Sequence, residues 1–458
     1  MSERDAVRQP TLPPFDHQPA PYGGPSIEEV RSTRDQYLNP AIFTIYPEPF
    51  MLVEGRGQYV FDEKGRRYLD LFAGIVTVSC GHSHPRVVAA IRNQSERIQH
   101  TTTIYLNPEV GKYAKRLAGK LPSGLDVSYF VNSGSEANDL AITMARLFTG
   151  NTDVIALRNA YHGASPFAVG LTSHHTWKYP LPQGDGVHHV TCPDPYRNPT
   201  ATSPEALARQ CAAEVEEVIR YSTSGKIAAF IAEPIQGVGG VTSAAPNYLR
   251  EVYEVVRKYG GICISDEVQT GFGRTGNHFW GFENFDVVPD MVTMAKGMGN
   301  GVPIGGVTTR REIAEVLAQR IHFNTYGGNP VCMAAAQAVL DVIEEEQLQE
   351  NSRVVGGYFK AGLQTLAERH PLIGDVRGMG LMLGVELVTD RETRAPAKAE
   401  TMRLLEICRR HSLLVGKGGL DGNVLRIKPP MCIHRADVDF ALEVLDLAFT
   451  EIAAGRED

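Results

Sequence analysis

Short runs of apolar residues recur through the middle of the chain, and a polar or glycine-rich segment follows each of them. An extended backbone would place apolar side chains on both of its faces here, which is typical of strands buried in a parallel sheet. We therefore predict buried strands at residues 127–131, 154–157, 227–232, 262–265 and 291–295.

Helical patterns separate these runs. Residues 140–148 (LAITMARLF) and the apolar positions spaced three and four apart between Tyr248 and Tyr259 each fit one face of a helix, and Gly260 and Gly261 end the second pattern. Strand, helix and strand in this order form a right-handed parallel unit. The pattern predicts an α/β fold in which helices cover both faces of a mostly parallel sheet.

The two ends of the chain have a different pattern. The C-terminal third predicts helices near residues 334–343 and 354–367 and short strands near 381–387 and 424–427. Residues 58–71 (QYVFDEKGRRYLDL) predict a hairpin. We expect these segments to form a second, smaller α+β domain.

The predicted division of the chain follows from these patterns. It consists of an N-terminal arm (1–30), the N-terminal part of the small domain (31–80), a large domain (81–330) and the C-terminal part of the small domain (331–458). Residues 10–25 contain six prolines, which favours an extended arm, although a disordered tail would have the same composition.

Composition excludes several classes of protein. Hydrophobic residues make up 43% of the 458 residues, enough for a large core, and the net charge of −8 gives no electrostatic reason to bind nucleic acid. No apolar run approaches the roughly 18 residues that span a bilayer, and residues 1–10 look like neither a signal peptide nor a transit peptide. We expect a cytoplasmic protein that binds neither nucleic acid nor membranes.

The cysteines and histidines form no metal-binding pattern. The seven cysteines are scattered and include no C-x-x-C pair, which argues against a disulfide framework or a zinc site and favours a reducing compartment. Three histidine pairs also lack suitable further ligands: His82/His84, His174/His175 and His188/His189. We predict no metal.

Two nucleotide-binding motifs have to be considered. Residues 271–276 (GFGRTG) match the dinucleotide fingerprint, but NHFWGFENF follows instead of a helix that could bind a pyrophosphate. The run ICISDEV resembles an ATPase metal site, but no phosphate-binding G-x-x-x-x-G-K-[ST] loop accompanies it. A nucleotide-binding regulatory or scaffold protein built on the GFGRTG loop remains the alternative from another class.

Three polar residues stand at the ends of successive predicted strands. Glu233, Asp266 and Lys296 are separated by about one strand–helix repeat each, so we expect them to converge at one edge of the sheet. A lysine whose amine loses its charge on burial can form a Schiff base, and an aspartate can hold a pyridine nitrogen protonated. An ordinary buried Asp–Lys ion pair is the structural alternative.

Two further segments complete a candidate cofactor site. NSGSEAN (132–138) offers small residues at a strand-to-helix turn, where backbone N–H groups and the helix dipole favour a phosphate, although helix capping alone explains the serines. Tyr161, in YHG, can stack on a planar ring. An amine, a carboxylate, a phosphate cup and a stacking ring together describe pyridoxal phosphate better than any other cofactor.

These motifs stand in the order found in a known family. The chain resembles, over nearly its whole length, the class III, fold-type-I, pyridoxal-phosphate-dependent aminotransferases. Within that family it is most similar to the alanine–glyoxylate branch, through GIVTVSCGH, HFWGF and RIKPPMC. The family motifs are GHSHP (81–85), NSGSEAN (132–138), YHG (161–163), EPIQG (233–237), DEVQTGFGRTG (266–276), TMAKGMGNG (293–301) and NTYGGNP (324–330).

The resemblance implies catalytic and phosphate-binding roles. Lys296 matches the lysine that forms the Schiff base and moves the proton at the substrate α-carbon, and Asp266 matches the partner of the pyridine nitrogen. The phosphate cup corresponds to Ser133, Gly134 and Ser135.

The same resemblance implies how the cofactor ring is held. Tyr161 and Val268 would contact its two faces, and His162 belongs to the same group of cofactor-binding residues. Gln269 lies where the family contacts the phenolic oxygen, and Glu233 is expected to orient the network.

Assembly and substrate choice are implied by four more positions. Thr325 matches a threonine that reaches the phosphate from the neighbouring subunit, which implies a homodimer with shared sites, alone or within a tetramer. Arg426 matches the arginine that binds the substrate carboxylate. Ornithine-type relatives have a masking glutamate where this chain has Val238 and a tyrosine where it has Ile75.

The pattern therefore favours a donor with one carboxylate, such as alanine or a β-amino acid, and a small oxo-acid acceptor such as glyoxylate or pyruvate, with ping-pong turnover through a Schiff base. The alternatives are another class III ω-aminotransferase of the 4-aminobutyrate or ornithine type, or an aminomutase, racemase or decarboxylase that uses the same cofactor.

Overall fold

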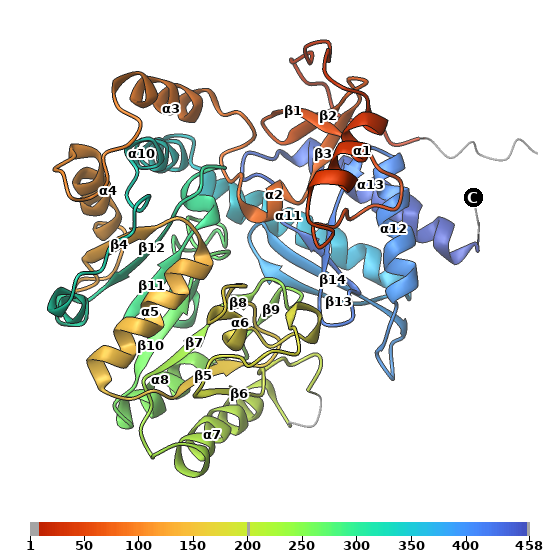
Figure 1. Ribbon diagram of the computed structural model, residues 1–458. Coiled ribbons are helices and arrows are strands. Elements are labelled where there is room, and N and C mark those ends of the chain that lie inside the picture. The colour runs from red at the N-terminus through yellow and green to blue at the C-terminus, as the bar shows by residue number, and fades with distance from the viewer. Residues whose placement is uncertain (1–8, 199–201, 456–458) are drawn as a thin grey trace, which may run out of the picture.

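The computed structural model describes residues 9–198 and 202–455, and a seven-stranded sheet forms the centre of its larger part (Figure 1). In spatial order the strands are β4 (Val127–Val131), β12 (Gly305–Thr309), β11 (Met291–Met294), β10 (Ile262–Asp266), β7 (Ala229–Ala232), β5 (Val154–Leu157) and β6 (Val187–Val190). From β11 to β6 every pair is parallel, and β12 runs antiparallel to both of its neighbours. The predicted mostly parallel sheet is confirmed.

Successive side chains of these strands enter two different cores. Val154 and Ala156 of β5 belong to the core that contains helix α5 (Gly134–Thr149). Ile155 and Leu157 belong to the other core, with α7 (Pro204–Ser222) and α8 (Tyr248–Lys258). Because both faces are covered, the central strands β5 (VIAL) and β7 (AFIA) are apolar at every position, which is why the sequence shows unbroken apolar runs there.

A second sheet lies in the C-terminal part of the chain. Its order is β13 (Ile373–Met379), β14 (Met382–Asp390), β18 (Val424–Ile427) and β17 (Gly416–Gly418), and β15 (Ala395–Pro396) also pairs with β14. Helices α11 (Leu348–Arg369), α12 (Lys398–Arg410) and α13 (Arg435–Ala453) pack beside it. Figure 1 shows this sheet in blue next to the green strands of the large sheet.

The N-terminal strands join the C-terminal part rather than the large sheet. The hairpin of β2 (Tyr59–Asp62) and β3 (Arg67–Asp70) is flanked by β1 (Leu52–Arg56) and by β16 (Leu413–Leu414), which pairs with β3 in parallel. A small domain built from both chain ends is thus compatible with the sheets, while its boundaries remain a prediction.

The proline-rich segment lies along this N-terminal sheet. The Phe15 ring packs against the Tyr59 ring with centroids 4.6 Å apart, and the Ala20 N–H donates to Glu54 Oε2 over 2.9 Å. Helix α1 (Ile27–Tyr37) begins inside the predicted arm, after a capping box formed by Ser26 and Glu29. Residues 1–8 of the arm lie outside the described residues.

The other helices complete the two parts. Helix α10 (Pro330–Glu345) packs on α3 (Pro85–Arg97) and α4 (Pro108–Ala118). In residues 9–198 and 202–455, no helix combines the length and the apolar character that crossing a bilayer requires. The short elements are α2 (Ala73–Val76), α6 (Ala168–Leu171), α9 (Arg311–Ala314), the two-stranded sheet of β8 (Ile235–Gln236) and β9 (Thr242–Ser243), and the 3₁₀ turns η1 (His175–Trp177), η2 (Gly281–Phe285), η3 (Lys296–Met298) and η4 (Glu315–Gln319).

Candidate active site

Lys296 follows strand β11 and opens the 3₁₀ turn η3. Its backbone has φ +44°, in the left-handed region that residues other than glycine avoid, which marks a conformation held by its surroundings. Burial lowers the pKa of its amine to about 8; Asp266 and Glu233 act in the opposite direction, and Arg426 adds to the lowering. A sizeable fraction of the amine is therefore uncharged and nucleophilic near neutral pH.

Asp266 ends strand β10 with 3% of its surface exposed. Its Oδ2 accepts hydrogen bonds from His162 Nδ1 and Asn138 Nδ2, both over 2.8 Å, and its Oδ1 accepts one from the Val268 N–H over 3.1 Å. Burial alone would raise the pKa of this carboxyl, but the contacts with His162 and Asn138 outweigh burial and lower it. Asp266 therefore remains ionised inside the protein.

Glu233 follows strand β7 at the same edge of the sheet. Its two carboxylate oxygens accept from the Tyr161 N–H (3.0 Å) and the Gly237 N–H (2.7 Å). Burial raises its pKa, His162 opposes the shift and Asp266 adds to it. Glu233 thus connects the backbone of YHG with that of EPIQG.

The NSGSEAN segment meets the other motifs through close approaches at glycines. A Cβ on Gly134 would lie 3.0 Å from Val268 Cγ2, and a Cβ on Gly163 would lie 2.4 Å from Ser135 Oγ. Ser133 caps helix α5, where its Oγ accepts from the Glu136 N–H over 3.2 Å. The N-terminus of a 16-residue helix thus lies beside Val268 and the YHG segment, where a phosphate would be favoured.

Arg426 lies on strand β18 with 5% of its surface exposed. Its Nη2 donates to Gln269 Oε1 over 3.2 Å, and the Phe72 ring lies 5.3 Å from the guanidinium carbon. Burial lowers its pKa to about 10, opposed by Glu233. Its Nε–H has no hydrogen-bond partner among the described residues, so the guanidinium retains donor capacity for a ligand.

The structure places three more of the predicted site residues, Tyr161, Ile75 and Thr325. The Tyr161 ring meets Trp177 edge-on with centroids 5.1 Å apart. Ile75 is 46% exposed on a left-handed turn, Ala73–Val76, in which all four residues have positive φ. Thr325 is exposed on a loop and forms no hydrogen bond with the described residues of its own chain.

Sequence reasoning missed Asn138 and Lys428. Asn138 could have been found, because it lies one helical turn after Gly134 in the NSGSEAN motif. Lys428, which has no exposed surface, donates from Nζ to Gln269 Oε1 over 2.9 Å. It stands two residues after Arg426, at the spacing that places side chains on one face of a strand.

The histidine pairs lie in ordinary polar contacts. His82 pairs with Asp70, His84 with Glu346 and His188 with Asp153, each over 2.8 to 2.9 Å. Within residues 9–198 and 202–455, no group of three or more His, Cys, Asp or Glu side chains could hold a metal ion.

The described residues fit pyridoxal phosphate. Lys296 would bind it covalently, Asp266 would pair with its ring nitrogen, and the N-terminal turn of α5 would hold its phosphate. Two buried polar atoms beside Asp266, His162 Nε2 and Asn138 Oδ1, have no partner among the described residues, as expected of a site that is completed by a ligand. When bound, this cofactor supplies an electron sink for the substrate α-carbon.

Comparisons with known proteins agree with this site. The family "Aminotransferase class-III" matches residues 45–449. Alanine–glyoxylate aminotransferase 2 homolog 2, mitochondrial, of Arabidopsis thaliana is 51% identical over 97% of this chain and 92% of its own length, and alanine–glyoxylate aminotransferase 2, mitochondrial, of Homo sapiens is 44% identical over 97% and 90%. An (S)-enantioselective omega-transaminase from Thermomicrobium roseum superposes with TM-score 0.86 at 36% identity, covering 93% of this chain and 98% of that one.

The chain belongs to the class III aminotransferases and is a pyridoxal-phosphate-dependent transaminase. The predicted cytoplasmic location is wrong by the same comparison, because the plant and human relatives are named as mitochondrial proteins. Targeting segments are read by receptors and contribute nothing to the folded core, so the absence of a visible one carried no information about location.

The pKa of Lys296 predicts how the apoenzyme reacts with its cofactor. Only the neutral amine attacks an aldehyde, so the rate at which added pyridoxal phosphate becomes borohydride-trappable should rise about tenfold per pH unit below pH 7 and level off above about pH 8. In the Lys296→Ala variant, borohydride should trap no pyridoxal phosphate at this site. A rate that still rises steeply above pH 9.5 would show an amine with its ordinary pKa.

The contacts of Asp266 predict a graded pair of variants. Asp266→Asn removes the charge and should weaken binding of pyridoxal phosphate and lower kcat about a hundredfold, because a neutral amide cannot keep the ring nitrogen protonated. Asn138→Ala removes one hydrogen bond to Asp266 and one to the His162 carbonyl but keeps the charge, so its effect should be about tenfold. Equal effects of the two variants on kcat would contradict the role assigned to the charge.

Proposed function

We propose that the enzyme transfers the amino group of a small amino acid, alanine or a β-amino acid, to glyoxylate or pyruvate. The observation that carries this proposal is the state of Arg426, which is buried, retains an unpartnered Nε–H and forms no ion pair with a carboxylate of the described residues. A Cβ on Gly418 would lie 2.4 Å from Arg426 Cδ and 2.9 Å from the Val238 carbonyl oxygen, so the backbone of Val238, where ornithine-type relatives have a glutamate, lies close to the arginine.

The relatives support the same substrates. Two of them, at 51% and 44% identity, carry alanine and glyoxylate in their names. The omega-transaminase likeness, at 36% identity, keeps a second candidate open, an enzyme that accepts amines whose amino group is remote from any carboxylate.

We assign the chemical steps to residues of this chain. Arg426 would bind the carboxylate of the donor and, after the first product leaves, that of the acceptor. The Lys296 amine would take the proton from the substrate α-carbon in one half-reaction and return one in the other. Asp266 would hold the proton on the cofactor nitrogen, while Tyr161 and Val268 would position the ring and Gln269 its phenolic oxygen.

We also propose that two copies of the chain assemble with shared sites. Large apolar side chains are exposed on two loops, one at residues 104–106 and a second at residues 321–326. The two loops lie near each other, since a Cβ on Gly328 would lie 3.4 Å from Thr103 Cγ2. An apolar face of this kind is typical of an interface between subunits. Thr325 lies within the second loop, which would place it against the partner. The exposed residues are Ile104 (69%), Tyr105 (67%), Leu106 (105%), Ile321 (99%), Phe323 (50%) and Tyr326 (64%).

Arg426→Ala tests the substrate assignment. Loss of a bidentate contact to a charged carboxylate in a partly dry pocket should cost on the order of 2–4 kcal/mol, which lowers kcat/KM for both alanine and glyoxylate by about 30- to 1,000-fold. The kcat/KM for an amine donor without a carboxylate should change little.

Val238→Glu gives the complementary result, since a glutamate beside Arg426 should depress alanine turnover. Parent enzyme that used the terminal amine of ornithine faster than alanine would contradict the alanine–glyoxylate assignment while leaving the cofactor assignment intact.

Mixing two inactive chains tests the shared site. If Thr325 acts across the interface, a dimer of one Thr325→Ala chain and one Lys296→Ala chain has one site with neither lesion and one site with both. Each mixed dimer should therefore have about half the activity of a parent dimer. The activity is measured after the two variants have exchanged subunits. No gain above the separate variants, in dimers shown by tag capture to be mixed, would place Thr325 in the site of its own chain.

A further inference from the structure

The loop of residues 237–240, between the short strands β8 and β9, is held in an unusual way. Each of its four consecutive backbone carbonyls accepts a hydrogen bond from a different segment of the protein. The donors are Lys428 Nζ to Gly237 (3.3 Å), the Gly419 N–H to Val238 (2.9 Å), Asn159 Nδ2 to Gly239 (2.8 Å) and Arg377 Nε to Gly240 (2.9 Å).

Three of these four donors come from the C-terminal sheet or its margins. Arg377 lies on β13, Gly419 follows β17 and Lys428 follows β18. The chain reaches this loop from β7 of the large sheet by way of β8, and Glu233, which follows β7, accepts a hydrogen bond from the Gly237 N–H. The loop therefore connects the strand edge that carries Lys296 and Asp266 with the sheet that carries Arg426.

The loop also packs directly against the strand positions beside Arg426. Gly384 of β14 is the register partner of Arg426, and a Cβ there would lie 3.0 Å from the Gly240 carbonyl oxygen. On the other side, Gly418 of β17 leaves no room for a side chain between Arg426 and the Val238 carbonyl. The position of this loop thus fixes the position of the Arg426 strand.

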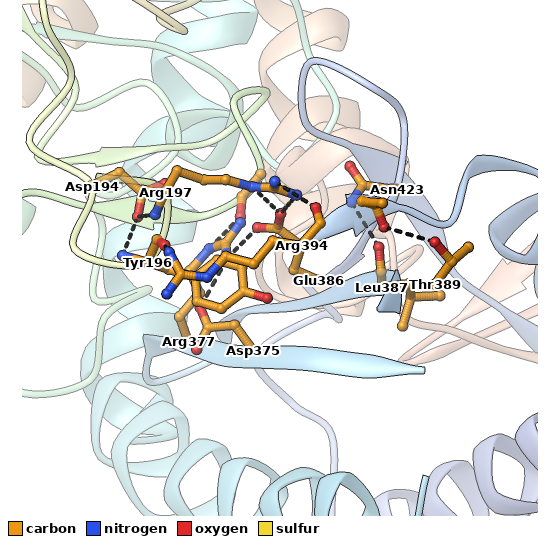
Figure 2. A network of polar contacts seen from close by, with 12 residues as sticks. Asp194, Tyr196, Arg197, Asp375, Arg377, Glu386, Leu387, Thr389, Arg394 and Asn423 are labelled. Carbon is orange, nitrogen blue, oxygen red and sulfur yellow. Dashed lines mark hydrogen bonds and ion pairs between the residues drawn. The ribbon is translucent and has the colours of Figure 1, made fainter. Parts of the chain in front are cut away.

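Ion pairs hold Arg377 in place for this contact. Arg377 Nη1 lies 2.6 Å from Glu386 Oε2, and Arg197, from the segment after β6, donates from Nε to Glu386 Oε1 over 2.6 Å. Glu386 is buried and Arg377 nearly so, with side-chain exposures of 4% and 12%. Figure 2 shows Arg197 and Arg377 converging on this carboxylate from the two parts of the molecule.

The loop is closely packed on most of its sides, since a Cβ on Gly237 would lie 2.3 Å from the Gln269 side chain and one on Gly239 2.5 Å from the Asn159 carbonyl oxygen. Gly239, Thr242 and Gly419 line a cavity of ≈ 480 Å³ next to the loop, together with Arg377. If its carbonyls lose their donors, the loop can therefore shift only toward this cavity.

We propose that the 237–240 loop is a spacing element, which Arg377 and Lys428 hold so that Arg426 stays at a fixed separation from Lys296. A fixed separation between a carboxylate-binding group and the reacting amine selects substrates by the distance between their own carboxylate and amino groups. Arg377 and Lys428 are thus positioning residues for specificity. This inference rests on the proposed binding of the substrate carboxylate by Arg426.

The test compares donors whose two functional groups are increasingly far apart: alanine, β-alanine and 4-aminobutyrate. Arg377→Lys can keep an ion pair with Glu386 but loses the fork that also reaches Gly240. The donor ratio is kcat/KM for the preferred donor divided by kcat/KM for the poorest one. We expect Arg377→Lys to lower this ratio by about tenfold, mainly through a change in KM. Lys428→Met, which removes the donor to Gly237 and also the one to Gln269, should change the ratio in the same direction.

Controls separate spacing from general damage. Arg391→Lys is the matched control, because the Arg391 guanidinium also donates to backbone carbonyls, among them those of Pro371 and Ala367. These residues are far along the chain from the loop, so this variant should leave the donor ratio unchanged. The affinity of each apoenzyme for pyridoxal phosphate, measured by fluorescence quenching, should stay within about twofold of the parent.

Three results would overturn the inference in distinguishable ways. An unchanged donor ratio, with kcat/KM falling equally for all three donors or with only a lower Tm, would leave Arg377 and Lys428 a merely structural role. A large loss of cofactor affinity would place their effect on the cofactor site instead. A parent enzyme that used none of the three donors would overturn the proposed function and this inference together.

Discussion

Asp266 carries an ionised carboxylate with 3% of its surface exposed, and burying such a charge is costly unless hydrogen bonds replace the lost water. The bonds come from Asn138 in helix α5, His162 after strand β5 and the Val268 N–H after β10. Each donor belongs to a different sequence motif. The contacts that keep the charge stable therefore also fix helix α5, the YHG segment and the turn after strand β10 relative to one another.

Three buried basic side chains lie near this carboxylate: Lys296, Arg426 and Lys428. Burial is the main cause of a lowered pKa at Lys296, Arg426 and Lys428, and Glu233 opposes it at all three. A bound anion would stabilise the charged forms of these groups, so the site favours anionic ligands. The proposed phosphate at the end of α5 and the proposed carboxylate at Arg426 would both be stabilised in this way, which is an electrostatic reason for a phosphorylated cofactor and an acidic substrate to share one site.

Much of the site could be predicted because the important residues follow local features of the chain. Glu233, Asp266 and Lys296 stand directly after apolar runs, and parallel strands bring their carboxyl ends to one edge. The residues that were missed act through partners remote in sequence: Asn138 reaches a residue 128 positions away and Lys428 one 159 positions away. No periodicity in the sequence encodes such pairings.

The sequence by itself determined the buried strands, their alternation with helices, and the cofactor class, because burial imposes an apolar pattern and the cofactor demands particular side chains at strand ends. Only the tertiary structure decided that GGVTT forms the antiparallel strand β12, since two glycines look like a loop until Val131 and Met294 lie on either side. It also decided which donors hold the carbonyls of residues 237–240. Those contacts join segments far apart in the chain, and packing, not local propensity, brings them together.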